Sequence, residues 1–308
     1  MQTIDHDNDH GHSLAEDLER MEALVARRRA LKWFAGAGTA ALVTACGESG
    51  SSGVAVVTGT SSPTPTPTPT PTATATATPT PTPTATSTGS CIVDPTETNG
   101  PYPADGTNTS SGSTSNALTA TGIVRSDIRS SFLGTSTTTA AGVQLTLTLT
   151  VVNVNAACAP LASYAVYIWC CDRQGNYSLY TAPAESYLRG VQVTDANGQV
   201  TFTLIFPGCY SGRWPHIHFE VFSSLATATG GRFASLVSQL ALPSAVCTTV
   251  YADTATYPSS ASNFRSITLS SDNVFSDNTS AQIAQQTPTL TGSVAAGYTG
   301  SAIIGIAR

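Results

Sequence analysis

Hydrophobic and polar residues alternate along much of the second half of the chain. At residues 143–151, valine or leucine occupies every second position, and glutamine or threonine lies between. This period of two is typical of a strand with one buried face. Residues 164–171 form a continuous apolar and aromatic run, which indicates a central strand. Residues 215–221, 235–242 and 300–306 indicate further strands.

Turn residues and the scarcity of helical patterns extend this interpretation. Residues 191–194 and 199–204 flank the sequence Asp-Ala-Asn-Gly at 195–198, which predicts a β-hairpin. Only residues 245–252 and 280–286 are candidates for short helices. Strands at this spacing, without long helices between them, predict an all-β fold. We expect an antiparallel β-sandwich with long loops that carry the active site and few short helices.

Composition and charge narrow the classes of partner. Hydrophobic residues make up 41% of the 308 residues, enough to build a core, whereas charged residues make up only 10%. The net charge is −6, and Lys32 is the only lysine. Binding to phosphates needs clustered lysine and arginine, so we expect no nucleic-acid partner. No run of 18 apolar residues occurs, so no permanent membrane span is expected.

The first 46 residues predict export. Basic residues at 27–32 precede a mildly apolar stretch at 33–45, which resembles a twin-arginine-type signal peptide. Residues 43–46 resemble a bacterial lipobox and predict a membrane tether through a lipidated Cys46. A plain signal peptide cut near Ala45 is the alternative. Either way, we expect a cell-surface or periplasmic lipoprotein or a secreted protein.

A linker is predicted at residues 47–90. This segment consists mainly of Gly, Ser, Thr, Ala and Pro, and residues 63–88 are almost purely Pro-Thr and Ala-Thr repeats. Proline fixes the backbone φ angle and threonine cannot supply a core, so a polyproline-II spacer is expected. A flexible, glycosylated stalk is the alternative. The folded domain then occupies residues 91–308.

The cysteine content fits an oxidising compartment. Besides Cys46, the chain has an even six cysteines, which allow up to three disulfides: Cys91, Cys158, Cys170, Cys171, Cys209 and Cys247. Cys170 and Cys171 are adjacent, so on a strand they face opposite sides and should not pair with each other. A zinc site is the alternative, although the chain lacks the paired Cys-x2-Cys pattern.

His216 and His218 are the only histidines of the predicted domain. At positions i and i+2 of a strand, both side chains point to one face and can bind one metal ion. Two ordinary surface histidines are the structural alternative. Glu220 lies on the same face, so a two-histidine, one-carboxylate iron(II) site, or a copper site built on the pair, also stays open.

Several segments together resemble the intradiol ring-cleavage dioxygenases, the family of catechol 1,2-dioxygenase and protocatechuate 3,4-dioxygenase. The resemblance covers essentially residues 91–308 and is closest to the secreted, single-domain members. The matching segments are residues 97–102, 125–129, 158–161, 168–172, 175–178, 187–190, 194–198, 206–210 and 212–219. One departure is Cys170, which stands where the family commonly has a histidine that is not a metal ligand.

The resemblance implies an Fe(III) cofactor held by Tyr177, Tyr210, His216 and His218. A phenolate is a hard anionic donor that suits iron(III) better than iron(II). Free tyrosine has a pKa of about 10, so it needs a strong neighbouring cation to ionise at neutral pH.

The resemblance also assigns roles around the metal. Arg213 is expected to stabilise charge on the bound substrate, and Tyr210 is the tyrosinate expected to leave the iron when the substrate chelates. Gln239 is a further candidate catalytic residue. Pro101 and Tyr102 are expected to line the substrate pocket together with Arg213.

The implied function is an iron(III)-dependent dioxygenase that inserts both atoms of O2 into a catechol-type ring and gives a cis,cis-muconate-type diacid. Its partners would be a small aromatic diol and O2. One alternative is a non-catalytic aromatic-binding module on the same fold. Another is a different mononuclear metal oxidase that uses His216 and His218.

Overall fold

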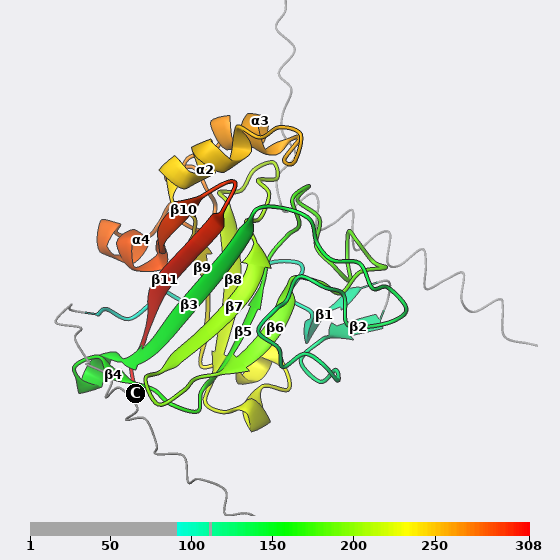
Figure 1. Cartoon of the computed structure of the whole chain (residues 1–308). Coiled ribbons are helices and arrows are strands. Elements are labelled where there is room, and N and C mark those ends of the chain that lie inside the picture. Colours follow the sequence, from blue (N-terminus) through cyan, green and yellow to red (C-terminus); the bar gives the residue numbers. More distant parts are fainter. Residues whose placement is uncertain (1–90, 111–112) are drawn as a thin grey trace, which may run out of the picture. The chain divides into compact units, whose positions relative to one another are not determined.

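A computed structural model describes residues 91–110 and 113–308 (Figure 1). The predicted signal peptide, Cys46 and the predicted linker lie outside the described residues. Within the described residues, every helix is too short or too polar to cross a membrane.

Two β-sheets form the body of the domain (Figure 1). The five-stranded sheet contains β10 (Thr289–Ser293), β11 (Gly297–Ile306), β3 (Gln144–Asn153), β4 (Ala159–Pro160) and β7 (Gln199–Ile205). The four-stranded sheet contains, in order, β6 (Arg189–Val193), β5 (Ala165–Trp169), β8 (His216–Phe222) and β9 (Leu236–Ala241). A separate hairpin joins β1 (Asp105–Ser110) and β2 (Ser113–Asn116).

Short helices and long loops connect the strands. The helices are α2 (Ser244–Tyr251), α3 (Ser260–Arg265) and α4 (Ser280–Gln286), with 3₁₀ turns at Val154–Ala156, Leu225–Thr227 and Gly231–Phe233. Helix α4 begins at a capping box, in which Thr279 accepts a hydrogen bond from the backbone of Gln282 and Gln282 accepts one from the backbone of Thr279. This exchange satisfies amide groups that the first helical turn leaves unpaired.

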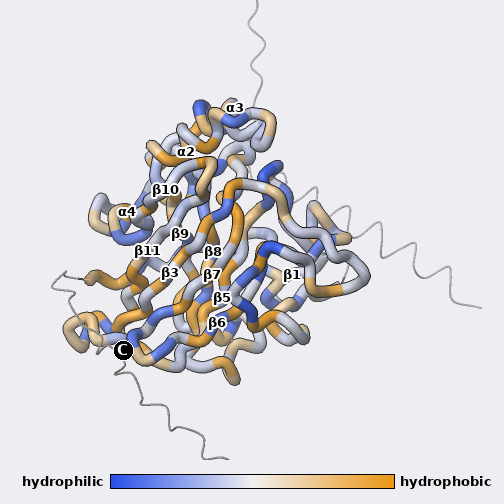
Figure 2. The backbone as a smooth tube through the Cα atoms, viewed as in Figure 1, coloured by the Kyte–Doolittle hydropathy of each residue, from blue (hydrophilic) through white to orange (hydrophobic). Residues whose placement is uncertain are grey.

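The core lies between the two sheets. Leu145, Leu147 and Leu149 of β3 are fully buried and pack in one cluster with alternate residues of β8, including Ile217 and Phe219. The hydropathy-coloured backbone shows hydrophobic stretches along these strands (Figure 2). Full burial of such a side chain stabilises the fold by about 1.5–3 kcal/mol. The apolar residues at every second position of the strand therefore form the core.

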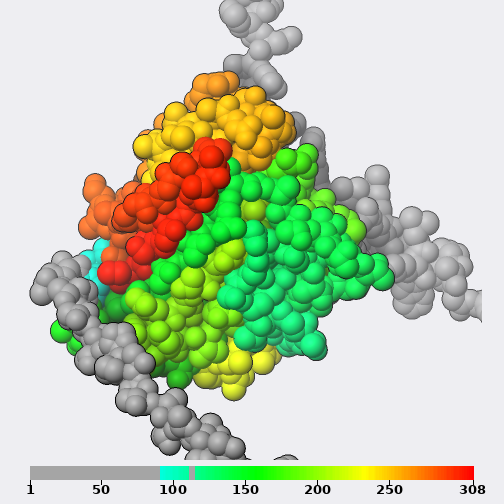
Figure 3. Space-filling view, viewed as in Figure 1, coloured from blue at the N-terminus to red at the C-terminus, as the bar shows by residue number. Residues whose placement is uncertain are grey.

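The two outer faces differ. The outer face of the five-stranded sheet is polar: Thr201 of β7 and Thr299 and Ser301 of β11 are exposed there, and Figure 3 shows β11 and β3 side by side at the surface. The outer face of the four-stranded sheet instead carries a second apolar cluster, which includes Tyr167 and Trp169. Loops cover that face, and the candidate site lies there.

Most of the predicted elements are confirmed. Both predicted helices occur within one residue of their expected bounds, and each predicted strand is present. The sandwich is mainly antiparallel, but β11 pairs with β3 in parallel. A parallel neighbour requires a long connection, and here most of the domain separates the two strands. Helix α3 and strands β1, β2, β4 and β10 were not anticipated because they are short and lack a clear hydrophobic period.

The predicted hairpin at residues 195–198 is wrong. The turn itself forms, with the Gly198 amide donating to the Asp195 carbonyl and φ of Gly198 at +73°. However, β6 pairs with β5 in one sheet, whereas β7 pairs with β3 in the other. Local turn residues fix where the chain reverses, but the strand's partner is set by the sheet that buries its apolar face.

One disulfide, Cys91–Cys158, joins the start of the domain to the loop after β3. Among the described residues, Cys170, Cys171, Cys209 and Cys247 are free thiols, and all four are buried. The expectation that Cys170 and Cys171 do not pair is confirmed. The sequence allowed up to three bridges, and the described domain forms one.

Candidate metal centre

His216 and His218 lie on β8 with their rings on the outer face of the four-stranded sheet. The strand is buried along its whole length, so both imidazoles are almost fully enclosed. Trp169 of the neighbouring strand β5 stacks on the His218 ring, with centroids 4.8 Å apart and planes 6° apart. This stacking fixes one histidine ring against the sheet.

Two loops bring tyrosines to the histidine pair. Tyr177 follows β5 in a turn held by Asp172, whose carboxylate accepts hydrogen bonds from the backbone amides of Gln174 and Asn176. Tyr210 lies in the loop between β7 and β8. Gly175 has φ of +89°, and a Cβ at this position would lie 2.8 Å from Cβ of Tyr210. Glycine here therefore allows the two tyrosine loops to approach.

The four donor atoms converge on one point. The Tyr177 Oη lies 3.2 Å from Nε2 of both His216 and His218, and the two Nε2 atoms are 3.1 Å apart. The Tyr210 Oη lies 3.2 Å from His216 Nε2 and 3.4 Å from Tyr177 Oη. The structure thus brings together all four residues that the sequence predicts as metal ligands.

These separations match those of ligand atoms around one metal ion. Bonds of about 2.0–2.1 Å, typical of zinc–nitrogen, in a tetrahedral arrangement hold ligand atoms about 3.3–3.4 Å apart. The His216 Nδ1 donates to the Trp214 carbonyl, so its Nε2 presents a lone pair to the cluster. Two imidazole nitrogens and two phenol oxygens are chemically suited to a small, highly charged transition-metal ion. The residues therefore fit iron(III).

Burial sets the protonation of these groups. It lowers the pKa of His216 and of His218 well below the usual value, and the nearby Arg213 guanidinium adds to the effect on both. Burial raises the pKa of Tyr177 and of Tyr210 above that of a free phenol. Without metal, all four groups are therefore neutral near pH 7, and only the tyrosines must lose a proton to become ligands.

Arg213 and Gln239 lie together beside the histidine strand. The Arg213 guanidinium donates to Gln239 Oε1 at 2.8 Å, and Gln239 Nε2 donates to the Thr98 carbonyl at 2.8 Å. Gln239 is directly opposite His218 on the paired strand β9. The structure thus connects two predicted catalytic residues that are 26 positions apart in the sequence.

The segment before β1 forms one wall of the site. The Tyr102 ring packs against Tyr177, with centroids 5.0 Å apart, and against Tyr180, at 5.2 Å. A Cβ at Gly100 would lie 3.3 Å from the His218 ring, so the backbone passes close to that imidazole. Pro101 is exposed next to this approach. The predicted substrate-lining pair Pro101 and Tyr102 therefore borders the donor cluster.

Glu220 does not join the histidines. Across the described residues, no three His, Cys, Asp or Glu side chains gather closely enough to hold a metal ion. Glu220 is fully buried against Asp105, and burial together with this neighbouring carboxyl raises the pKa of Glu220 well above its usual value. The alternatives of a two-histidine, one-carboxylate site and of a cysteine zinc site are wrong for this part of the chain.

Cys170 faces away from the donors. It belongs to the core cluster between the sheets, whereas its neighbour Cys171 lies in the outer cluster with Tyr177. Burial raises the pKa of the Cys170 thiol above its usual range. A cysteine at this position is therefore compatible with the four-donor centre.

Sequence reasoning missed two buried polar residues beside the site. Asp272 accepts hydrogen bonds from Arg213 Nε and the Trp214 amide, at 2.9 and 2.6 Å. Arg189 donates to the carbonyls of Tyr102 and Ser178, at 2.9 and 2.8 Å. Arg189 lies in residues 187–190, one of the segments that resemble the dioxygenase family, but the resemblance assigns it no role. Asp272 lies in a polar stretch between short helices, where no local pattern indicates burial.

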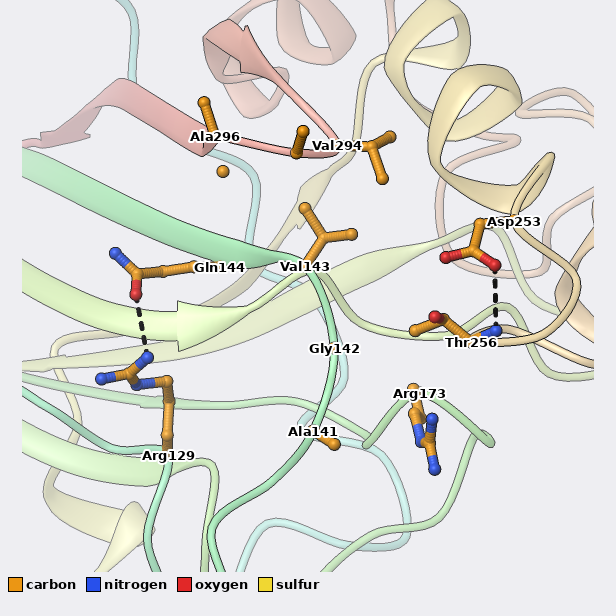
Figure 4. A pocket seen from close by; sticks show the side chains of 12 residues that line it. Arg129, Ala141, Gly142, Val143, Gln144, Arg173, Asp253, Thr256, Val294 and Ala296 are labelled. Atoms are coloured by element: carbon orange, nitrogen blue, oxygen red, sulfur yellow. Dashed lines mark hydrogen bonds between the residues drawn. The ribbon is translucent and has the colours of Figure 1, made fainter.

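A separate cavity of about 540 Å³ lies elsewhere in the domain (Figure 4). It is lined in part by Arg129, Gly142 and Arg173, and Arg129 donates to Gln144 across one side. None of the predicted site residues lines this cavity. This cavity is therefore distinct from the donor cluster.

Comparison with known proteins gives a match to a family model and a shared fold. Residues 123–244, which include the four donors and Gln239, match the sequence model of the family described as Dioxygenase. No curated protein matches the sequence. The intradiol ring-cleavage dioxygenase from Tetranychus urticae is 23% identical with a TM-score of 0.50, and the match covers 70% of this chain and 95% of that chain.

Two other solved structures are more distant. The dioxygenase domain of a dioxygenase and carbohydrate-binding fusion from Streptomyces sp. SirexAA-E is 20% identical, with a TM-score of 0.42 over 70% of this chain and 99% of that chain. Catechol 1,2-dioxygenase from Pseudomonas arvilla C-1 is 17% identical, with a TM-score of 0.36 over 59% and 56%. Residues 123–244 thus match the Dioxygenase family model, and the domain shares the fold of the intradiol ring-cleavage dioxygenase from Tetranychus urticae.

Proposed function

We propose that this chain is an iron(III)-dependent dioxygenase that opens a catechol-type ring between its two hydroxylated carbons. Its substrates would be a small aromatic diol and O2, and its product a cis,cis-muconate-type diacid. The observation that carries the proposal is the convergence of two phenol oxygens and two imidazole nitrogens, in which five of the six pairs of donor atoms lie within 3.4 Å. The match of residues 123–244 to the Dioxygenase family model supports the same reaction class.

Tyr177, Tyr210, His216 and His218 would hold the iron. Bound iron(III) would supply Lewis acidity and a template for the diol. His216 and His218 enter as neutral donors because burial keeps their pKa low. The two phenols provide the anionic charge that offsets the metal.

The two tyrosines have different environments, which supports different roles. The Tyr177 Oη contacts all three other donor atoms, and its side chain is buried. The Tyr210 Oη contacts only Tyr177 and His216, and its residue is partly exposed on a loop. We assign Tyr177 as the permanent ligand and Tyr210 as the donor whose Oη takes a proton from the arriving diol.

The remaining residues would orient the substrate. Tyr102 offers an aromatic face beside the donor cluster, and Pro101 borders the same approach. Arg213 would stabilise negative charge on the diol oxygens through its planar, positively charged guanidinium. Gln239 would fix the Arg213 fork through the hydrogen bond to its Oε1.

Ligand variants of the full chain test the proposal. Iron-loaded wild type should absorb visible light, as tyrosinate–iron(III) centres do, and should consume O2 with catechols. Tyr210→Phe should retain iron but lose most turnover, and Tyr177→Phe should retain iron poorly. Tyr180→Phe is a matched control because the Tyr180 hydroxyl binds Asn108 and the Ala104 amide rather than the donors.

The outcomes also separate the alternatives. Colourless iron-loaded protein would contradict the tyrosinate centre. Tight binding of catechols without O2 consumption would favour a non-catalytic aromatic-binding module. If Tyr177→Phe retains iron as well as wild type while Tyr210→Phe loses it, the two assigned roles are reversed.

We also propose export through the twin-arginine-type signal, with a membrane tether at Cys46. The support is the basic segment at residues 27–32 and the lipobox-like residues 43–46. Replacing Arg28 and Arg29 with lysine should leave the protein in the cytoplasm, measured by cell fractionation. Normal export of this double variant would contradict the proposed route.

A further inference from the structure

Asp272 is a fully buried carboxylate that accepts four hydrogen bonds. Its Oδ2 accepts from Arg213 Nε at 2.9 Å and from the Trp214 amide at 2.6 Å. Its Oδ1 accepts from the amides of Val274 and Phe275 at 2.8 and 3.1 Å. One oxygen thus anchors the carboxylate to its own loop, and the other holds the segment that precedes His216.

The first connection to the site runs through Arg213. Nε of its guanidinium is held by Asp272, and the terminal NH2 group donates to Gln239 at 2.8 Å. Two acceptors from different elements therefore define the plane of the guanidinium. The Arg213 side chain is 13% exposed, whereas Asp272 is completely enclosed, so the carboxylate is the buried end of this pair. A buried ion pair of this kind fixes geometry because both partners lose the alternative of water.

The second connection runs through the Trp214 peptide. Its amide donates to Asp272, and its carbonyl accepts from Nδ1 of His216. The indole of Trp214 donates to the Leu242 carbonyl at 3.0 Å, which fixes the residue from a third side. The orientation of the His216 ring, and with it the direction of Nε2, therefore depends on a peptide that Asp272 holds.

We propose that Asp272 is a positioning residue that sets both the Arg213 guanidinium beside the substrate and the His216 imidazole at the metal centre. The inference rests on the proposed function for its catalytic consequence. Asp272 does not touch the donor atoms, and it acts through Arg213 and Trp214. Its carboxylate also balances the charge of Arg213, which would otherwise face the metal uncompensated.

The substitution Asp272→Asn in the full, iron-loaded chain tests this proposal. Asparagine keeps the shape but offers one acceptor oxygen instead of two, so it cannot hold both its own loop and the Arg213–Trp214 segment. We expect kcat/KM for catechol to fall about 10–100-fold, the usual effect of losing a residue that orients a metal ligand. Iron retention during dialysis against a chelator should fall as well, and the visible band should shift.

Asp94→Asn provides the matched control. Asp94 is also buried, at 2% exposure, and accepts a backbone hydrogen bond, but from Gly305 rather than from a site residue. We expect this variant to change the melting temperature while keeping the wild-type kcat/KM, iron retention and visible spectrum. Wild-type values of all three in Asp272→Asn would overturn the proposal.

Arg213→Lys keeps the inference testable if Asp272→Asn does not fold. Lysine keeps the charge but lacks the planar fork that reaches Asp272 and Gln239 together. It should therefore lose kcat/KM in the same range, and wild-type turnover would overturn the proposal. Where both variants fold, the double variant should lose less than the product of the single losses, because the residues act as a unit. If the loss of kcat/KM in the double variant equals the product of the two single losses, the link between Asp272 and Arg213 is contradicted.

A failure of the proposed function can be distinguished from a failure of the inference about Asp272. Wild-type protein that binds iron but opens no catechol would refute the proposed function alone. In that case iron retention decides the inference: weaker retention in Asp272→Asn than in wild type and Asp94→Asn supports it, and equal retention overturns it.

Discussion

Iron(III) binding to this domain should release two protons near neutral pH. Both Tyr177 and Tyr210 must ionise to become ligands, and burial raises the pKa of each phenol above its ordinary value. His216 and His218 release none, because burial lowers their pKa and leaves both rings neutral. The affinity for iron should therefore rise with pH.

The magnitude follows from the number of phenols. Each proton released changes the binding constant tenfold per pH unit, which is about 1.4 kcal/mol. Two phenols give a hundredfold increase from pH 6 to pH 7, about 2.7 kcal/mol. Tyr210→Phe removes one ionising ligand and should reduce the increase to tenfold.

Competition with a chelator of known affinity measures this dependence. The apparent constants at pH 6 and 7 are corrected for protonation of the chelator and for hydrolysis of free iron. Tyr180→Phe serves as the control and should keep the hundredfold slope, because its phenol binds Asn108 and a backbone amide. A corrected affinity that does not change with pH, or an equal slope in wild type and Tyr210→Phe, would refute the reasoning.

Three further outcomes are expected. Cys91→Ser should lower the free energy of unfolding by about 4 kcal/mol in urea, because the disulfide closes a loop between residues 67 positions apart; an unchanged midpoint would contradict this. Burial raises the pKa of Asp94 from 3.8 to about 7, so the free energy of unfolding should fall as pH rises through this window, by up to about 4 kcal/mol. In urea titrations at several pH values, Asp94→Asn should remove this pH dependence, and the same pH dependence in the variant would contradict the prediction. A chain that begins at Ser90 should keep full turnover, and loss of turnover in a folded chain would show that the linker does more than space the domain.

The strand pattern could be predicted because burial and sequence have the same period. In β3 the leucines are buried and the threonines are not, so the alternation identifies one face of the strand. The alternation does not identify which strands pair with each other. The Asp-Ala-Asn-Gly turn at 195–198 is local, whereas the choice of β3 as the partner of β7 depends on how two sheets share one core.

The donor residues could be predicted for a similar reason. His216 and His218 lie two positions apart on a strand, so their common face follows from strand geometry alone. Tyr177 and Tyr210 lie on loops, and only resemblance to a family singled them out. Asp272 could not be found, because its role depends on contacts with Arg213 and Trp214 that are 59 and 58 positions away.

Cleavage of catechol under ¹⁸O2 tests the central claim most directly. Purified, iron-loaded chain is mixed with catechol and labelled oxygen, and mass spectrometry identifies the ring-opened product. The account predicts a cis,cis-muconate-type diacid that carries one labelled oxygen in each new carboxyl group. A product opened outside the two hydroxylated carbons, a product with no label, or recovery of intact catechol would contradict it.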